Sequence, residues 1–135
     1  MDKQELRQYR ALLAEIALLE EEQRRLADGA LSAVALTGMP KGSGITDDTG
    51  RLAAKLADLA YLIAAKLEEA IAVRLQIERA IEGLDGQERV LMRLRYIEGK
   101  TWEEIAVAMR YHYRHVLRLH ERILQGLAQD RGPRH

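Results

Sequence analysis

The sequence lacks cysteine and phenylalanine and has two prolines, Pro40 and Pro133. Without cysteine, disulfides and thiolate metal sites are excluded. Proline is the residue that a helix interior tolerates least, so its scarcity favours helices. The apolar content of 47% is mostly Leu, Ala, Ile and Val, too much for a disordered polar tract. We therefore expect an all-α protein with a buried core.

Long apolar runs are also missing. The most apolar stretch, residues 59–65, is far too short to cross a bilayer. Asp2, Lys3 and Glu5 give the chain a charged start that argues against a signal peptide. We expect a soluble, cytoplasmic protein with no membrane partner.

A net charge of zero conceals an asymmetry between the two parts of the chain. Residues 1–86 contain 11 Lys and Arg against 15 Asp and Glu, a balance of −4. Residues 87–135 contain 10 against 6, a balance of +4, and include all four histidines. This division indicates two roles in one chain, with the basic part facing a polyanion.

Residues 3–26 have the pattern of an amphipathic helix. Apolar positions recur at alternating steps of three and four, at Tyr9, Leu12, Ile16, Leu19, Gln23 and Leu26. The pattern weakens at Asp28 and Gly29, where the helix either ends, bends or continues for two more turns over residues 30–36.

Residues 37–50 contain four glycines and Pro40, which predicts a flexible loop between two helices. The run Lys41-Gly-Ser-Gly is not a phosphate-binding P-loop, because such a loop has Lys after its second Gly and follows a strand.

A second long helix is expected over about residues 48–82, capped by Thr46, Asp47 or Asp48. Its apolar seam is formed by Leu52, Leu56, Leu59, Ile63, Ala70, Val73, Ile77 and Leu84. A stripe of this length requires a partner. We expect residues 1–83 to form an antiparallel, coiled-coil-like helical hairpin. The second helix exceeds the expected first one in length, so we also expect a homodimer or higher oligomer.

After Gly86 the pattern predicts three short helices. The first, residues 87–97, has an inner face of Val90, Leu91, Leu94 and Ile97. The second is capped by Thr101, with Glu104 completing a capping box, and places Trp102, Ile105, Ala106 and Met109 at core spacing. The third, from residue 113 to about residue 127, buries Val116, Leu119, Ile123 and Leu127. Two short helices joined by Arg110, Tyr111 and His112 have the layout of a helix-turn-helix.

The run from Leu84 to Ala106, LDGQERVLMRLRYIEGKTWEEIA, resembles sigma-factor region 4, and Tyr113-Arg-His-Val-Leu-Arg-Leu-His resembles its recognition helix. The whole chain is similar to the RinA/ArpU-like phage regulators of late transcription. Those regulators join a helical arm, a loop containing Met-Pro and glycines (here residues 39–44) and a region 4-like C-terminus. The resemblance implies a DNA-binding domain at residues 84–128, a tail at 129–135, and a transcription activator in the cytoplasm of a bacterial host. Double-stranded DNA is the implied partner, with host RNA polymerase as a second one.

Two positions depart from the usual helix-turn-helix pattern. Arg110 stands where Gly is common, and His112 stands where Ser or Thr usually caps the recognition helix. The expected DNA face consists of Tyr113, Arg114, His115, Leu117 and Arg118, because these positions flank the core face of the third helix. Phosphate contacts are expected from Lys100, Thr101, Arg110, His112 and Arg122.

No nucleophile and base are paired in the sequence, so we expect no enzyme activity and no cofactor. The spacing of His115 and His120 is poor for a metal site, and no metal is expected. Two other functions fit the same pattern. One is a small terminase-like packaging subunit, which joins a helix-turn-helix to helices that form rings. The other is a sigma-like module that binds RNA polymerase without DNA.

Overall fold

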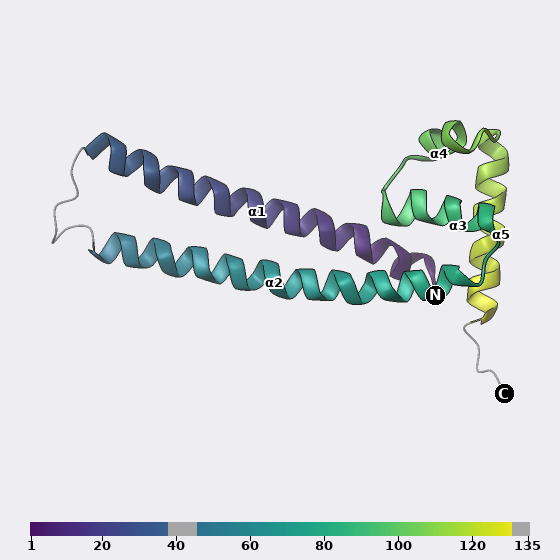
Figure 1. Cartoon of the computed structure of the whole chain (residues 1–135), viewed down its shortest axis with the longest axis horizontal. Coiled ribbons are helices and arrows are strands. Elements are labelled where there is room, and N and C mark those ends of the chain that lie inside the picture. Colours follow the sequence, from purple (N-terminus) through teal and green to yellow (C-terminus); the bar gives the residue numbers. More distant parts are fainter. Residues whose placement is uncertain (38–45, 131–135) are drawn as a thin grey trace. The chain divides into compact units, whose positions relative to one another are not determined.

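The computed structural model describes residues 1–37 and 46–130, and these residues form helices and no strand (Figure 1). The helices are α1 (Lys3–Thr37), α2 (Thr46–Glu82), α3 (Gly86–Met92), the π-helical turn η1 (Arg93–Ile97), α4 (Trp102–Met109) and α5 (Tyr113–Asp130). The expected all-α class is confirmed. The centre of the predicted loop and most of the predicted tail lie outside the described residues.

The chain divides into two compact units. The hairpin unit comprises Leu13–Glu69, and the C-terminal unit combines Met1–Leu12 with Ala70–His135. The predicted division at residues 83 and 84 does not coincide with these units. The ends of both long helices pack with the short helices, because apolar side chains of α1 and α2 enter the same core as those of α3 to α5.

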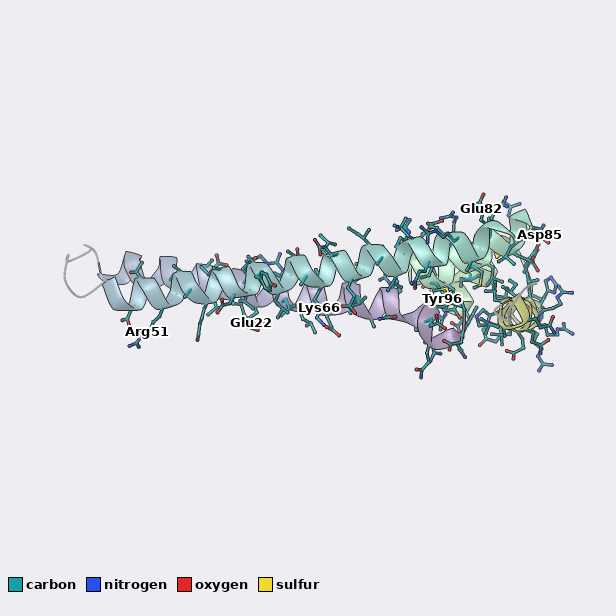
Figure 2. All side chains as sticks on the ribbon, turned by 90° about the horizontal axis from the view of Figure 1, so that it is seen from below. Glu22, Arg51, Lys66, Glu82, Asp85 and Tyr96 are labelled. Carbon is teal, nitrogen blue, oxygen red and sulfur yellow. The ribbon has the colours of Figure 1, made fainter. Side chains whose placement is uncertain are left out.

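In the hairpin unit, α1 and α2 run antiparallel, side by side (Figure 1). Their facing positions follow the predicted seams, with Ile16 buried and Leu56, Leu59 and Ile63 half-buried. Lys66 on α2 forms an ion pair of 2.9 Å with Glu15 on α1. Glu22 and Arg51 project from the two helices into solvent (Figure 2).

One of the alternatives left open at Asp28 and Gly29 is confirmed, and the expected bounds of the loop need correction. Helix α1 continues through Asp28 and Gly29 to Thr37, and α2 begins at Thr46, so the last five residues of the predicted loop are helical. A single glycine within a helix costs only about 1 kcal/mol, which neighbouring helix formers offset at Gly29 and Gly50. The two helices therefore have 35 and 37 residues, so α2 exceeds α1 by only two residues.

The core lies in the C-terminal unit. Its largest fully buried side chains come from α1, α2, α3, α4 and α5: Leu6, Ile77, Ile81, Leu91, Met92, Ile105 and Val116. Helix α5 packs against both α3 and α4. Burial of such side chains contributes about 1.5–3 kcal/mol each before the entropy of ordering is subtracted. This shared core holds the ends of the long helices against the three short ones.

A network of charged groups joins the same elements at the surface of this unit. The Glu78 carboxylate accepts hydrogen bonds from the Arg93 guanidinium at 2.5 and 2.9 Å and from Nε of Arg74 at 2.9 Å. Arg74 also donates to the Tyr9 hydroxyl at 3.1 Å. The network therefore connects α1, α2 and η1. Hydrogen bonds from Arg93 and then Arg74 keep the pKa of Glu78 below its usual value.

Glu78→Gln is expected to lower the free energy of unfolding by about 1–2 kcal/mol, because hydrogen bonds to a charged group are lost from a half-exposed site. Urea unfolding at pH 7 measures the change, and Glu68→Gln on the exposed face of α2 is the matched control. Because the pKa of Glu78 is lowered in the folded protein, its ionised carboxylate stabilises the fold at neutral pH. The difference from wild type should therefore shrink as the pH falls through the pKa of the folded protein. Equal stability at pH 7 would show that the network contributes nothing.

The first short helix differs from its prediction. After Met92 the chain forms a π-helical turn, with Glu98 N–H donating to Arg93 O at 2.9 Å. This turn rotates the following residues relative to a continuous α-helix. Tyr96 within the turn is buried, as is Met92 just before it, whereas Val90, expected on the inner face, is 46% exposed. Leu91 is buried as predicted.

Candidate nucleic-acid interface

Helix α4 begins at a reciprocal cap. The Thr101 hydroxyl accepts from Glu104 N–H at 3.1 Å, and the Glu104 carboxylate accepts from Thr101 N–H at 2.8 Å. This confirms the predicted capping box. The same three-residue spacing caps α3 through Asp85 and Glu88. The hydrogen bonds fix the end of α4 at which a phosphate contact is expected.

The turn between α4 and α5 is built on a left-handed residue, Arg110, with φ 58° and ψ 40°. Arg110 N–H donates to Val107 O at 3.2 Å, and Tyr111 N–H donates to Ala106 O at 3.0 Å. This pair of bonds is a Schellman motif, whose left-handed position is usually Gly. Arg110, which replaces the glycine common at this position, is therefore the residue with the strained left-handed conformation. The turn has the usual geometry despite this replacement.

Arg110→Gly is expected to raise the free energy of unfolding by about 0.5–1 kcal/mol. Gly removes the steric cost of the left-handed conformation, and the greater freedom of the unfolded chain offsets part of the gain. Arg110→Ala retains the strain and is the control, with no gain expected. Chemical denaturation measures both variants. A glycine variant less stable than the alanine variant would contradict this account of the turn.

Helix α5 begins at Tyr113, as predicted. His112 O accepts the first helical hydrogen bond, from Val116 N–H at 3.1 Å. Its ring Nδ1 accepts from Arg114 N–H at 3.4 Å, a long bond. His112 therefore occupies the capping position and fills it more weakly than a Ser or Thr would.

The inner face of α5 is apolar apart from one histidine. Val116, Leu119, Ile123 and Leu127 are buried, as the periodicity predicted. His120 is also buried, and its Nε2 shares a hydrogen bond of 2.5 Å with the Tyr96 hydroxyl. The Trp102 ring lies 4.4 Å from that of His120, centroid to centroid. Trp102 is thus an aromatic at the edge of the core.

The outer face of α5 carries the expected DNA-contacting residues. Tyr113, Arg114, His115 and Arg118 are exposed, and Leu117 is half-buried. Arg114, Leu117 and Arg118 line one shallow hollow. Among the described residues, neither Arg114 nor Arg118 forms an ion pair. A face with two unpaired guanidinium groups one helical turn apart is suited to acceptor atoms in a major groove.

The remaining candidates lie in separate places. Arg110 and His112 are exposed in the turn beside the start of α5. Lys100 and Thr101 precede α4, so eight helical residues, about 12 Å, separate them along the helix from the turn. Arg122 is exposed one turn beyond Arg118. The structure therefore brings seven candidates together around the turn and leaves two at the start of α4 and one further along α5.

Sequence reasoning missed the arginines that approach the start of α4 from other elements. Arg7 and Arg10 on α1 share a hollow with Arg95 and Gly99. The sequence places Arg7 and Arg10 outside the apolar seam that begins at Tyr9, so their exposure could be predicted. Their proximity to residue 99 depends on the packing of α1 in the C-terminal unit, which no local pattern reveals.

The geometry of α4, the turn and α5 defines a helix-turn-helix. Comparison with protein families places sigma-70, region 4, on residues 74–122. The segment is therefore a sigma-70 region 4-like helix-turn-helix, which indicates a DNA-binding regulatory role. The matched residues begin within α2 and include Arg74 and Glu78. No curated protein and no solved structure gave a significant match to the chain.

Among the described residues, no helix combines the length and the apolar character needed to cross a bilayer.

Proposed function

We propose that this protein is a sequence-specific, double-stranded DNA-binding transcription regulator, and that it activates late genes of a phage or prophage. The observation that supports base reading is the outer face of α5. There Arg114, Leu117 and Arg118 line one hollow, outside the buried face formed by Val116 and Leu119. In this proposal α5 enters the major groove, and each arginine pairs with the O6 and N7 atoms of a guanine.

Phosphate contacts would orient this helix on the duplex. Lys100 and Thr101 at the start of α4, Arg110 and His112 in the turn, and Arg122 on α5 are the proposed contacts. The late-gene role and the phage source are supported by the resemblance to RinA/ArpU-like regulators. The absence of a cofactor and of enzyme activity remains part of the proposal.

Fluorescence anisotropy with labelled duplex at two salt concentrations tests DNA binding. Tight binding that weakens steeply with salt is expected, because bound arginines and lysines displace counterions from the phosphates. Matched single-stranded DNA is the control and should bind more weakly. If no duplex binds even in low salt, the proposal of a DNA-binding regulator fails.

We also propose that the protein self-associates through the hairpin unit. Four large apolar side chains of this unit are 41–78% exposed: Leu18, Tyr61, Leu62 and Leu67. A second copy would remove them from water. Mass determination in solution distinguishes the alternatives. A dimer fits two half-sites in a palindromic operator, whereas eight or more copies would favour the terminase-like packaging subunit.

A surface on α4 favours a second candidate function, in which RNA polymerase is a partner. Val107 is 79% exposed and lines a hollow with Leu94 and Ala108. An exposed apolar side chain beside charged neighbours is suited to a protein contact. Capture of polymerase together with failure to bind duplex would favour the sigma-like module over the DNA-binding regulator.

A further inference from the structure

A basic hollow lies beside the start of α4 in the C-terminal unit. It measures about 210 Å³ and is lined by Arg7, Arg10, Arg95, Tyr96 and Gly99. Among the described residues, none of the three arginines forms an ion pair with a carboxylate. Three like charges facing one hollow repel each other, so an anion is the ligand that such a site favours.

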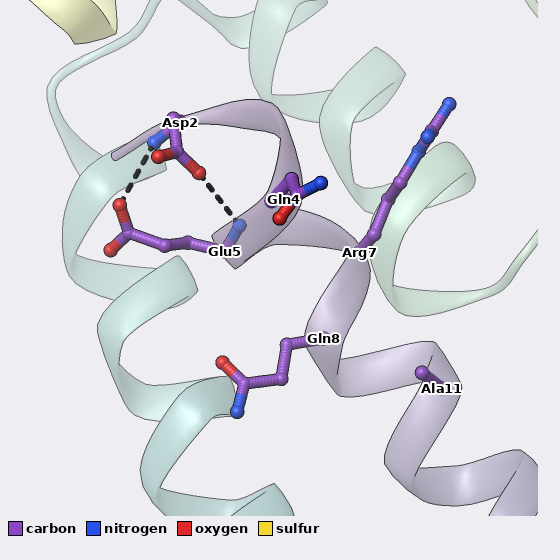
Figure 3. A pocket seen from close by; sticks show the side chains of 6 residues that line it. All are labelled: Asp2, Gln4, Glu5, Arg7, Gln8 and Ala11. Atoms are coloured by element: carbon purple, nitrogen blue, oxygen red, sulfur yellow. Dashed lines mark hydrogen bonds between the residues drawn. The ribbon is translucent and has the colours of Figure 1, made fainter.

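Arg7 and Arg10 project from the first turns of α1, whose start is fixed by its own cap. Glu5 N–H donates to the Asp2 carboxylate at 2.8 Å, and Asp2 N–H donates to the Glu5 carboxylate at 3.3 Å. Figure 3 shows these two bonds and the Arg7 side chain extending away from both acids. Among the described residues, Arg7 forms no ion pair with either of these carboxylates.

Arg10 is held against the turn before α4. Its Nη1 donates to Ile97 O at 3.1 Å. A Cβ atom on Gly99 would lie 2.7 Å from Nε of Arg10, closer than such atoms approach each other. Gly99 also has a φ of +74°, which favours glycine. The turn conformation therefore depends on glycine, and a side chain at residue 99 would displace the Arg10 guanidinium. The hydrogen bond to Ile97 leaves most of the Arg10 donors unused.

Arg95 is held at the other side of the same turn. Its Nη1 donates to Lys100 O at 3.0 Å, and its Cζ lies 4.2 Å from the centroid of the Trp102 ring. Trp102 is the first residue of α4. The guanidinium is therefore oriented before any ligand arrives, which lowers the entropic cost of binding.

The positive charge of this region also influences the core. The pKa of His120 is lowered to about 4, mainly by burial and in smaller part by the charges of Lys3, Arg95 and Arg7. Two acidic residues, Glu103 and Glu104, lie in the first turn of α4. The Glu104 carboxylate already accepts a hydrogen bond from Thr101 N–H. The hollow therefore presents an excess of positive charge.

We propose that Arg7, Arg10 and Arg95 bind a phosphate of the DNA backbone beside the start of α4, so that the first turns of α1 form part of the DNA interface. This inference rests on the proposed DNA binding. Arginine matches the geometry of phosphate with two parallel hydrogen bonds. The site is continuous with Lys100 and Thr101, which the proposed function already places on phosphate.

Salt titration of duplex binding tests the proposal. For Arg7→Ala/Arg10→Ala, the slope of the logarithm of affinity against the logarithm of salt should become shallower by about 1, since one phosphate contact contributes about 0.9. The loss of affinity between 50 and 200 mM salt should then be about three- to fourfold smaller than for wild type. Arg24→Ala/Arg25→Ala, on α1 in the hairpin unit, removes the same charge and should retain the wild-type slope.

Arg10 has a structural hydrogen bond, so the double variant carries a risk to folding. Arg7 forms no hydrogen bond in the described structure, and Arg7→Ala alone should still make the slope shallower. An unchanged slope in both variants, with wild type binding DNA, would overturn this site and leave the proposed function intact. An equal change in the control pair would also overturn it, as a general effect of charge. Absence of duplex binding by wild type would overturn both proposals.

Discussion

Replacing Arg114 and Arg118 together by alanine is expected to reduce affinity for a preferred duplex by about 100-fold or more. Each bidentate arginine–guanine pair contributes about 1–3 kcal/mol of discrimination, and the two side chains lie on one exposed face of α5. Anisotropy titrations against the preferred duplex and a scrambled one measure the effect. The variant should bind both with similar, weak affinity, because the remaining contacts are to phosphate.

Two controls separate base reading from general charge. Arg51→Ala/Lys55→Ala, exposed on α2 in the hairpin unit, removes the same charge and should leave the preference unchanged. Arg114→Lys keeps the charge of α5 and loses the planar fork, so it should lose preference while retaining most non-specific affinity. If the double alanine variant kept the full preference, α5 would not be the reading helix.

Acidification from pH 7 to pH 4 is expected to destabilise the fold by about 3 kcal/mol through His120. Its pKa is about 4 in the folded protein, chiefly because the ring is buried, against 6.5 for an ordinary histidine. Between these values the unfolded chain binds a proton that the folded chain does not. Stability is therefore lost as the pH falls through this range, at about 1.4 kcal/mol for each unit.

Urea unfolding of wild type and His120→Gln at pH 7, 5.5 and 4 isolates this effect. Glutamine has no titration in the range and can still form a hydrogen bond with Tyr96. The variant should be less stable at pH 7 and should lose about 3 kcal/mol less than wild type on acidification. Parallel pH profiles for the two proteins would show that His120 does not remain neutral in the fold. Glu78 contributes to both profiles alike.

The periodicity of apolar residues predicted most of the fold, because apolar residues at helical spacing lie on the buried face of a helix. The seam positions of α1 and α2 and the inner face of α5 are set by steps of three and four. The capping box of Thr101 and Glu104 could also be predicted from the sequence, because it depends on two residues only three positions apart. The position of the turn at residues 110–112 followed from the same local signals.

Local patterns missed two features of the first short helix. They predicted Val90 on the inner face, whereas Met92 is buried there, and they did not predict the π-helical turn that contains the buried Tyr96. No residue preference marks such an insertion, which is stabilised by the packing it permits. The burial of His120 depends on the same turn, because Tyr96 supplies its hydrogen-bond partner.

Contacts between distant segments set the remaining features. Glu78 meets Arg93, and Arg10 meets Gly99, across 15 and 89 positions of sequence respectively. A single sequence contains no signal for such pairs. The sequence therefore predicted a domain boundary at residue 84, whereas the C-terminal unit also includes the start of α1 and the end of α2.

Selection of bound duplexes from a random pool, at low and at moderate salt, tests the central claim most directly. We predict recovery of one motif at both salt concentrations, with two half-sites at a fixed helical spacing if the protein is a dimer. Recovery of unrelated sequences that dissociate at moderate salt would mean attraction to the DNA backbone alone. That result would contradict sequence-specific regulation by α5.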